Sequence, residues 1–262
     1  MVLRQVLLGL TLATFQLPGT TQADTWQAGG TQWRPFSYED EQGNLRGIST
    51  DIARRVLQLA NIDAHFATYP VNRLQVMLAR GEVDVNYADS ALWNSPADLK
   101  RYVFSEPYMS VREHLYFLKD STAANTPVDK LTGLTIGTVR GYTYQLMDPL
   151  FAARRLTRLE TSEDPALLKL LQAGRVDAVA MVDELFEYLI ASQRLDRSLF
   201  KRGAQLSEAP VSLKLQPQYA ASLPSINAAI SSLIRSGEVI RVRTLYLTPF
   251  ASLECQANAA AC

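Results

Sequence analysis

Residues 73–90 read RLQVMLARGEVDVNYADS, and residues 166–183 repeat the same pattern as ALLKLLQAGRVDAVAMVD. In both copies the apolar residues first recur at helical spacing and then run without interruption, as in a helix followed by a strand buried on both faces. Gly81 and Gly174 stand between the two parts, where a residue without a Cβ ends a helix at least cost. The repeat therefore predicts two similar helix-strand units.

Each of the two predicted strands has a carboxylate at its start and polar residues at its end. Asp84 and Asp177 open the strands, and we interpret them as local turn or cap residues. Ligands of open α/β sheets bind at the opposite, carboxyl ends of the strands. We therefore expect binding residues among Asp89 and Ser90 in the first copy and among Val182 and Asp183 in the second.

Strand and helix patterns alternate around this repeat, which predicts mostly parallel sheets covered by helices. The chain leaves the first unit near residues 108–113 and returns near residues 207–211, so that two strands form a hinge. The expected fold is a two-lobed α/β structure with a ligand crevice between the lobes. The expected segments are 24–110 with 210–250 for the first lobe, 111–209 for the second, and 251–262 for a tail.

The first 23 residues have the pattern of a cleaved secretory signal, with one basic residue, a ten-residue apolar run and a small-residue stretch. An uncleaved membrane anchor is the alternative. Cys255 and Cys262 are the two cysteines, and an exported chain permits a disulfide between them; a disordered tail is the alternative.

The composition gives no indication of nucleic-acid binding or enzymatic chemistry. Lys plus Arg equals Asp plus Glu, 26 against 26, so no basic surface is expected. His65 and His114 are far apart in the sequence, and no glycine-rich phosphate loop or nucleophile motif occurs. We expect no cofactor and no metal site, although acid-base carboxylates such as Glu106 and Asp183 remain open.

Six motifs occur along the mature chain in one order. They are Pro35-Phe36 with Gly43, Gly47 and Asp51; the Leu78 to Asp84 repeat; Phe104-Ser105 with Pro107-Tyr108; Leu131, Gly133, Ile136 and Gly137; Gly174 to Ala178; and Leu233 with Gly237. In this set the chain resembles family 3 of the bacterial extracellular solute-binding proteins, the periplasmic amino-acid-binding components of ABC transporters. The resemblance implies a monomer that closes on a small solute and delivers it to a permease.

The chain departs from the family pattern at the positions that hold an α-amino acid. The family's carboxylate-binding Arg is replaced by Asp98, and the Asp that binds the α-ammonium aligns with Val182, one residue before Asp183. The loop Gly141-Tyr142-Thr143 retains the family's Thr, so Tyr142 and Thr143 are candidate contacts. We therefore expect a ligand other than an ordinary α-amino acid in the usual pose.

Aromatic residues supply the remaining predicted contacts on the first lobe. Trp33 stands where family members stack a ring over the ligand, and such a face suits an apolar group or a cation. Trp93 is expected to form a second aromatic wall. Phe36 is a further candidate, with packing as its alternative, since one of Phe36 and Tyr38 is expected to pack.

Two arginines are predicted anion contacts. Arg73 lies near the start of a helix whose amino end should face the crevice, and Arg140 lies in the turn before another helix. The alternatives are a solvated surface for Arg73, a surface salt bridge for Arg140, and a helix cap in place of ligand contact for Asp183.

Two other functions stay open from the sequence. One is a periplasmic enzyme of the same fold, because the chain is also similar to the cyclohexadienyl dehydratases. The other is a ligand-binding partner of a membrane sensor in place of a permease.

Overall fold

The computed structural model describes the backbone of residues 25–257 and the side chains of residues 25–247. The predicted signal peptide at residues 1–23 and the predicted disulfide between Cys255 and Cys262 lie outside the residues so described. Within the described residues, no helix is long and apolar enough to span a membrane.

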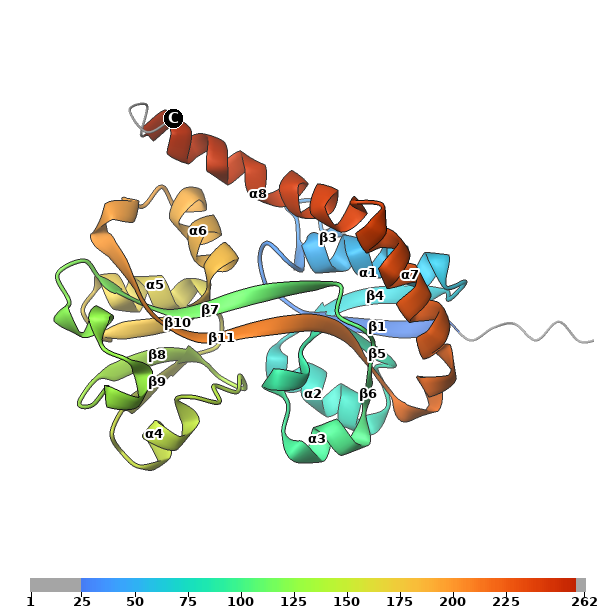
Figure 1. The fold of residues 1–262 in the computed structure, drawn as a ribbon, viewed down its shortest axis with the longest axis horizontal. Coiled ribbons are helices and arrows are strands. Elements are labelled where there is room, and N and C mark those ends of the chain that lie inside the picture. Colours follow the sequence, from blue (N-terminus) through green and yellow to red (C-terminus); the bar gives the residue numbers. More distant parts are fainter. Residues whose placement is uncertain (1–24, 258–262) are drawn as a thin grey trace, which may run out of the picture.

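The first lobe is built on a sheet with β1 at its centre (Figure 1). Strand β1 (Trp26–Thr31) pairs in parallel with β4 (Ala64–Tyr69) and β5 (Val85–Asp89), and β5 pairs antiparallel with β11 (Phe200–Leu215). The short β6 (Val103–Phe104) also pairs with β11, and β2 (Tyr38–Glu39) with β3 (Leu45–Arg46) forms a hairpin. The helices are α1 (Ile48–Leu59), α2 (Val71–Arg80), α3 (Pro96–Arg101) and α7 (Leu223–Arg235).

The second lobe repeats the parallel arrangement with β8 at its centre. Strand β8 (Thr135–Val139) pairs in parallel with β9 (Thr157–Thr161) and β10 (Ala178–Val182), and β10 pairs antiparallel with β7 (Met109–Leu118). Its helices are α4 (Asp148–Ala152), α5 (Pro165–Gln172) and α6 (Asp183–Ser192). The predicted two-lobed α/β fold is therefore confirmed.

The long strands β7 and β11 join the lobes (Figure 1). They pair antiparallel from Phe200 opposite Leu118 to Val211 opposite Met109, which joins the strands of the two lobes into one continuous sheet. The lobe boundaries that we predicted at residues 110–111 and 209–210 fall inside this pair. The division itself stays a prediction.

The repeated sequence forms the same local structure in both lobes. Gly81 and Gly174 adopt left-handed backbones with φ of 73° and 62° at the ends of α2 and α5, as predicted. Asp84 accepts a hydrogen bond of 2.7 Å from the Gln27 amide of β1, and Asp177 accepts one of 2.7 Å from the Thr135 amide of β8. The two carboxylates thus join adjacent strands at the amino ends of the sheets. We predicted local turn or cap residues, whereas these contacts reach a strand that is distant in the sequence.

The described part of the chain ends in α8 (Glu238–Ala257), which continues into the segment that we predicted as a tail, residues 251–262. It packs against α1 and α7 of the first lobe and against α6 of the second (Figure 1). Two short helices precede the strands β6 and β9. They are α3 at residues 96–101 and α4, which begins at Asp148.

Candidate functional site

Strand ends from both lobes converge on a cleft. Thr31 ends β1, Asp89 ends β5 and Val182 ends β10, and all three line this space. The loop that follows β8 adds Tyr142 and Thr143. The cleft therefore lies at the carboxyl ends of the strands, where open α/β sheets bind ligands.

Two tryptophans form an aromatic wall on the first lobe. Trp33 and Trp93 both line the cleft, with their rings 5.7 Å apart and nearly perpendicular. The Trp33 ring rests on Phe36 at 4.2 Å, and only 6% of Trp33 is exposed. Phe36 is fully buried and does not line the cleft, so its place is that of a packing residue behind Trp33.

Asp89 lines the cleft, and neighbouring side chains of the same lobe hydrogen-bond to its carboxylate. Its carboxylate accepts hydrogen bonds from the Asn86 and Asn94 side chains and lies 3.4 Å from the buried Lys214 ammonium. Burial raises the pKa of Asp89, and Lys214 opposes that rise. Ser90 is fully buried and accepts a hydrogen bond from the Leu92 amide, which places its hydroxyl outside the cleft lining. The Asp89 charge is thus largely balanced by the protein itself.

Two further carboxylates line the cleft from the second lobe, Glu113 of β7 and Asp164 before α5. Burial, reinforced by the negative charge of Asp164, raises the pKa of Glu113 from 4.5 to about 8, although Ser207 donates a hydrogen bond to it at 3.4 Å. Burial also raises the pKa of Asp164 from 3.8 to about 7, and a hydrogen bond from Tyr142 opposes this. In the part of the chain that the structure describes, neither carboxylate forms a salt bridge.

The loop after β8 also lines the cleft. Tyr142, Thr143 and Tyr144 all line the cleft. The Tyr144 hydroxyl accepts a hydrogen bond from the Val139 amide at 3.1 Å, which fixes the loop to the end of β8. Burial and the nearby carboxylates raise the pKa of both Tyr142 and Tyr144, so their hydroxyls are neutral and can donate hydrogen bonds.

The three remaining predicted contacts lie away from the cleft. Arg73 is exposed and stacks over the Tyr69 ring at 5.4 Å. Arg140 is exposed and lies 3.6 Å from Glu160, the surface pair that we gave as its alternative.

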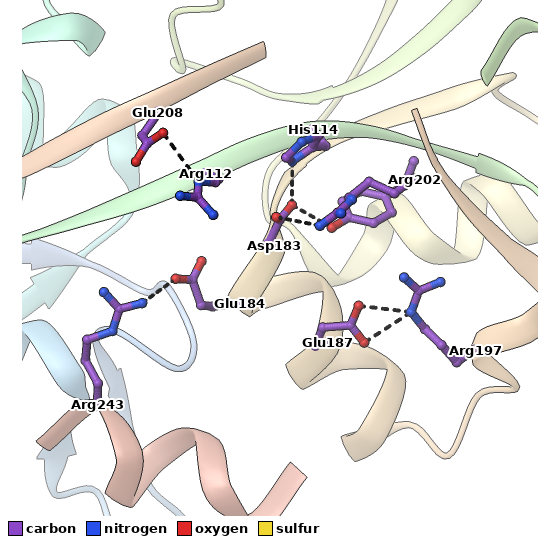
Figure 2. Close-up of polar contacts among 10 residues, drawn as sticks. Arg112, His114, Asp183, Glu184, Glu187, Arg197, Arg202, Glu208 and Arg243 are labelled. Carbon is purple, nitrogen blue, oxygen red and sulfur yellow. Dashed lines mark hydrogen bonds and ion pairs between the residues drawn. The ribbon is translucent and has the colours of Figure 1, made fainter. Parts of the chain in front are cut away.

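Asp183 is likewise occupied by neighbours in its own lobe. Figure 2 shows its carboxylate between His114 and Arg202, at 2.7 Å and 3.3 Å, and the Tyr116 hydroxyl donates to it at 2.7 Å. It is absent from the cleft lining. Glu106, the other carboxylate that we considered for acid-base chemistry, is exposed and also lies outside the lining.

Sequence reasoning missed Glu113 and Asp164, the two cleft carboxylates without a cationic partner. A weak signal existed for each. Glu113 is a charged residue directly before a run of buried strand residues, and Asp164 precedes the proline that opens α5 after a strand. Neither signal shows that the two side chains meet, because they come from elements about fifty positions apart.

The lobes touch each other across the cleft and behind it. At the rim, the Gln145 side chain donates a hydrogen bond to the Leu92 carbonyl at 2.6 Å. Arg34 of the first lobe donates to the Tyr188 hydroxyl of α6 at 3.0 Å. Arg243 of α8 lies 2.8 Å from Glu184 of α6 (Figure 2). These contacts hold the two lobes in a closed arrangement.

Within the described residues, no group of three or more His, Cys, Asp or Glu side chains could hold a metal ion. The cleft instead combines aromatic faces with carboxylates and hydroxyls, which is the chemistry of a binding site for a small polar molecule.

Residues 28–248 match the family model of bacterial extracellular solute-binding proteins, family 3. The chain belongs to this family. Among curated proteins, the Mannheimia haemolytica protein described as arginine-binding periplasmic protein is 28% identical over 145 residues. That match spans 55% of this chain and 57% of the relative.

Solved structures of amino-acid-binding proteins share the fold. An ancestral arginine-binding protein bound to arginine superposes with a TM-score of 0.73 at 20% identity, covering 85% of this chain and 97% of the other. The ancestral amino acid-binding protein AncCDT-1, described as a precursor of cyclohexadienyl dehydratase, gives 0.69 at 16% identity, covering 85% and 95%. At these identities the likeness concerns the fold alone.

Proposed function

We propose that this family 3 protein binds a small cationic, amino-acid-like solute in the cleft between its lobes. The single observation that carries the proposal is the pair Glu113 and Asp164, two cleft carboxylates for which the described residues offer no cation. A bound cation would supply the missing charge in a site shielded from water, where charged hydrogen bonds are strong. The arginine named for the curated relative and for the ancestral structure agrees with a cationic ligand.

The aromatic wall suits the same kind of solute. Trp33 and Trp93 both line the cleft with their rings nearly perpendicular to each other, and Tyr142 lines it from the opposite lobe. A cation over such a ring contributes about 0.5 to 2 kcal/mol. Each charged hydrogen bond contributes about 1.5 to 3 kcal/mol, so several of them, together with the aromatic contact, approach the roughly 8 kcal/mol that micromolar affinity requires.

The setting of this activity is part of the proposal. The protein acts in the periplasm after removal of residues 1–23, as a monomer that delivers its solute to an ABC permease in the inner membrane. The family assignment supports an extracellular location. Pull-down of the protein with membrane extracts, with and without its solute, distinguishes a permease from a membrane sensor as the partner.

The test of cation binding is a thermal-shift panel of cationic, neutral and anionic metabolites. We expect only cations to raise the melting temperature, and we expect Glu113→Gln and Asp164→Asn each to reduce the shift. Glu82→Gln is the matched control, because Glu82 is exposed and lies at the far end of α2. Equal shifts in all variants, or shifts with anions only, would refute the proposed site.

A dehydratase activity is the second candidate, and one observation favours it. Glu113 has a pKa of about 8, so it is protonated at neutral pH and could donate a proton inside the cleft. The absence of any Lys, Arg or His among the described lining residues opposes it, since prephenate and arogenate carry carboxylates. Incubating the protein with both compounds should give no aromatic product, and formation of one would replace the binding proposal.

A further inference from the structure

The cleft offers three carboxylates and no cationic side chain. Among the described residues that line it, the ionisable acids are Asp89, Glu113 and Asp164, and none is Lys, Arg or His. Lys214 is fully buried and does not line the cleft. Its ammonium group lies 3.4 Å from the Asp89 carboxylate and donates a hydrogen bond of 2.5 Å to the Asn94 side chain. Among the residues that the structure describes, the buried ammonium group nearest the cleft is therefore already paired with protein groups.

The arginines that a carboxylate would need also lie elsewhere. Arg73 stacks on Tyr69, and Arg140 pairs with Glu160 on the surface. The family pattern expects a cationic side chain at position 98. In this chain the residue there is Asp98 of α3, whose carboxylate accepts a hydrogen bond from the Ser95 hydroxyl. A ligand carboxylate in the closed cleft would therefore face acids without an opposing positive side chain.

Backbone amides are the other means of holding an anion, and the first turn of α2 packs against the second lobe. Val71, in this turn, lines the cleft. A Cβ on Gly141 of the second lobe would lie 2.5 Å from Asn72 Oδ1 and 3.1 Å from Val71 Cγ1. The side chains at this helix start are thus in contact with the opposite lobe.

We infer that the solute of this protein is an organic cation without a carboxylate: a decarboxylated amino acid, a diamine or a polyamine. The inference rests on the proposed function and narrows it. Glu113 and Asp164 hold the ammonium or guanidinium group, while Trp33 and Trp93 cover the methylene chain. An α-carboxylate would lose its water and gain no cationic side chain, and above the raised pKa values of the two acids it would also meet their negative charges.

Matched pairs of compounds that differ only by a carboxylate test this directly. Agmatine is compared with arginine, putrescine with ornithine, and cadaverine with lysine, by isothermal titration calorimetry of the wild-type protein at pH 8. We expect the best binder to be a decarboxylated member, at least about tenfold tighter than its amino acid, because an unpaired buried charge carries a penalty of that order or more.

The outcomes separate the inference from the proposed function. If an amino acid binds as tightly as its decarboxylated partner, or more tightly, the carboxylate is accommodated and the inference is overturned, while cation binding stands. If none of the six compounds binds and a neutral or anionic solute does, both fall. Glu113→Gln should weaken the tightest decarboxylated ligand, and Glu82→Gln should leave its affinity unchanged; the reverse pattern would place the cation outside the cleft and overturn the inference.

Discussion

Glu113 and Asp164 make solute binding depend on pH. Their pKa values of about 8 and about 7 are raised because both carboxyls are shielded from water in an acidic cleft, with Glu163, Tyr142 and Tyr144 as the neighbouring ionisable groups. A bound cation favours the charged carboxylates, so binding releases protons. Affinity should rise between pH 6 and pH 8.5, by at most about tenfold per pH unit for each proton released.

Calorimetry of a diamine across this range measures the effect. The double variant Glu113→Gln with Asp164→Asn should bind weakly and show a flat profile. A wild-type affinity that is constant or falls with rising pH would contradict the assignment.

The same carboxyls affect the stability of the unliganded protein. Because each pKa is higher in the folded protein than in the unfolded chain, the folded state binds more protons. The free energy of unfolding should therefore fall as the pH rises from about 4.5 to about 8. Urea denaturation of the empty protein checks this, and the double variant should lose less stability over that range than the wild type.

The tryptophans provide an independent readout of the site. The chain has three, Trp26, Trp33 and Trp93, and the last two line the cleft. Trp26 lies at the start of β1 and packs on Tyr219 with ring centroids 4.1 Å apart. We expect solute to change the intrinsic fluorescence of Trp26→Phe as in the wild type, and to change it less in Trp33→Phe and Trp93→Phe. Retention of the full signal in both cleft variants would place the solute elsewhere.

At the level of single residues, the sequence predicted about half of the site. Trp33, Asp89, Trp93, Tyr142 and Thr143 reach the cleft lining, although their contact with solute remains a prediction. Arg73 and Arg140 do not, because Arg73 stacks on Tyr69 and Arg140 pairs with Glu160 on the surface. Glu113 and Asp164 were beyond reach, since their proximity is created by the tertiary fold.

The Asp84 and Asp177 carboxylates are equivalent elements of the two lobes. Asp84 is half-buried and also accepts a hydrogen bond of 2.7 Å from Tyr219, whereas Asp177 is exposed. We expect Asp84→Ala to lower the free energy of unfolding by about 1.5 to 3 kcal/mol and Asp177→Ala by about 0.5 to 1.5 kcal/mol. Solute affinity should remain unchanged, as calorimetry can verify. A large loss of affinity with intact stability would give these residues a role in binding.

The elements themselves were largely predictable because the helix-strand repeat has a clear period in the sequence. The parts of the fold that the periodicity does not predict are a short helix and the far end of a long one. Helix α3 spans six residues and depends on the Ser95 cap, and α8 extends beyond the periodic segment. Helices of one or two turns are stabilised by caps and by packing, so periodicity alone does not show them.

For the whole molecule, α8 links the two lobes on the side of α6. Arg243 lies 2.8 Å from Glu184, and one of its nitrogens donates to the Ser110 carbonyl of β7 at 3.3 Å. Removing this contact in Arg243→Gln should shift the unliganded protein toward an open form and weaken solute binding a few-fold, because less of the binding-competent state is populated.

Small-angle X-ray scattering of the unliganded variant should then give a larger radius of gyration. Arg241→Gln is the matched control, since Arg241 lies on the same helix and pairs with Glu238 of that helix. Identical scattering and affinity in both variants would show that the link has no part in closure.

A crystal structure with the tightest-binding cation tests the central claim most directly. We predict a ligand nitrogen within about 3.2 Å of a carboxylate oxygen of Glu113 or Asp164, with the Trp33 ring against the ligand chain. A solute bound elsewhere, or one whose carboxylate is held by an arginine or lysine while both acids remain free, would contradict the account.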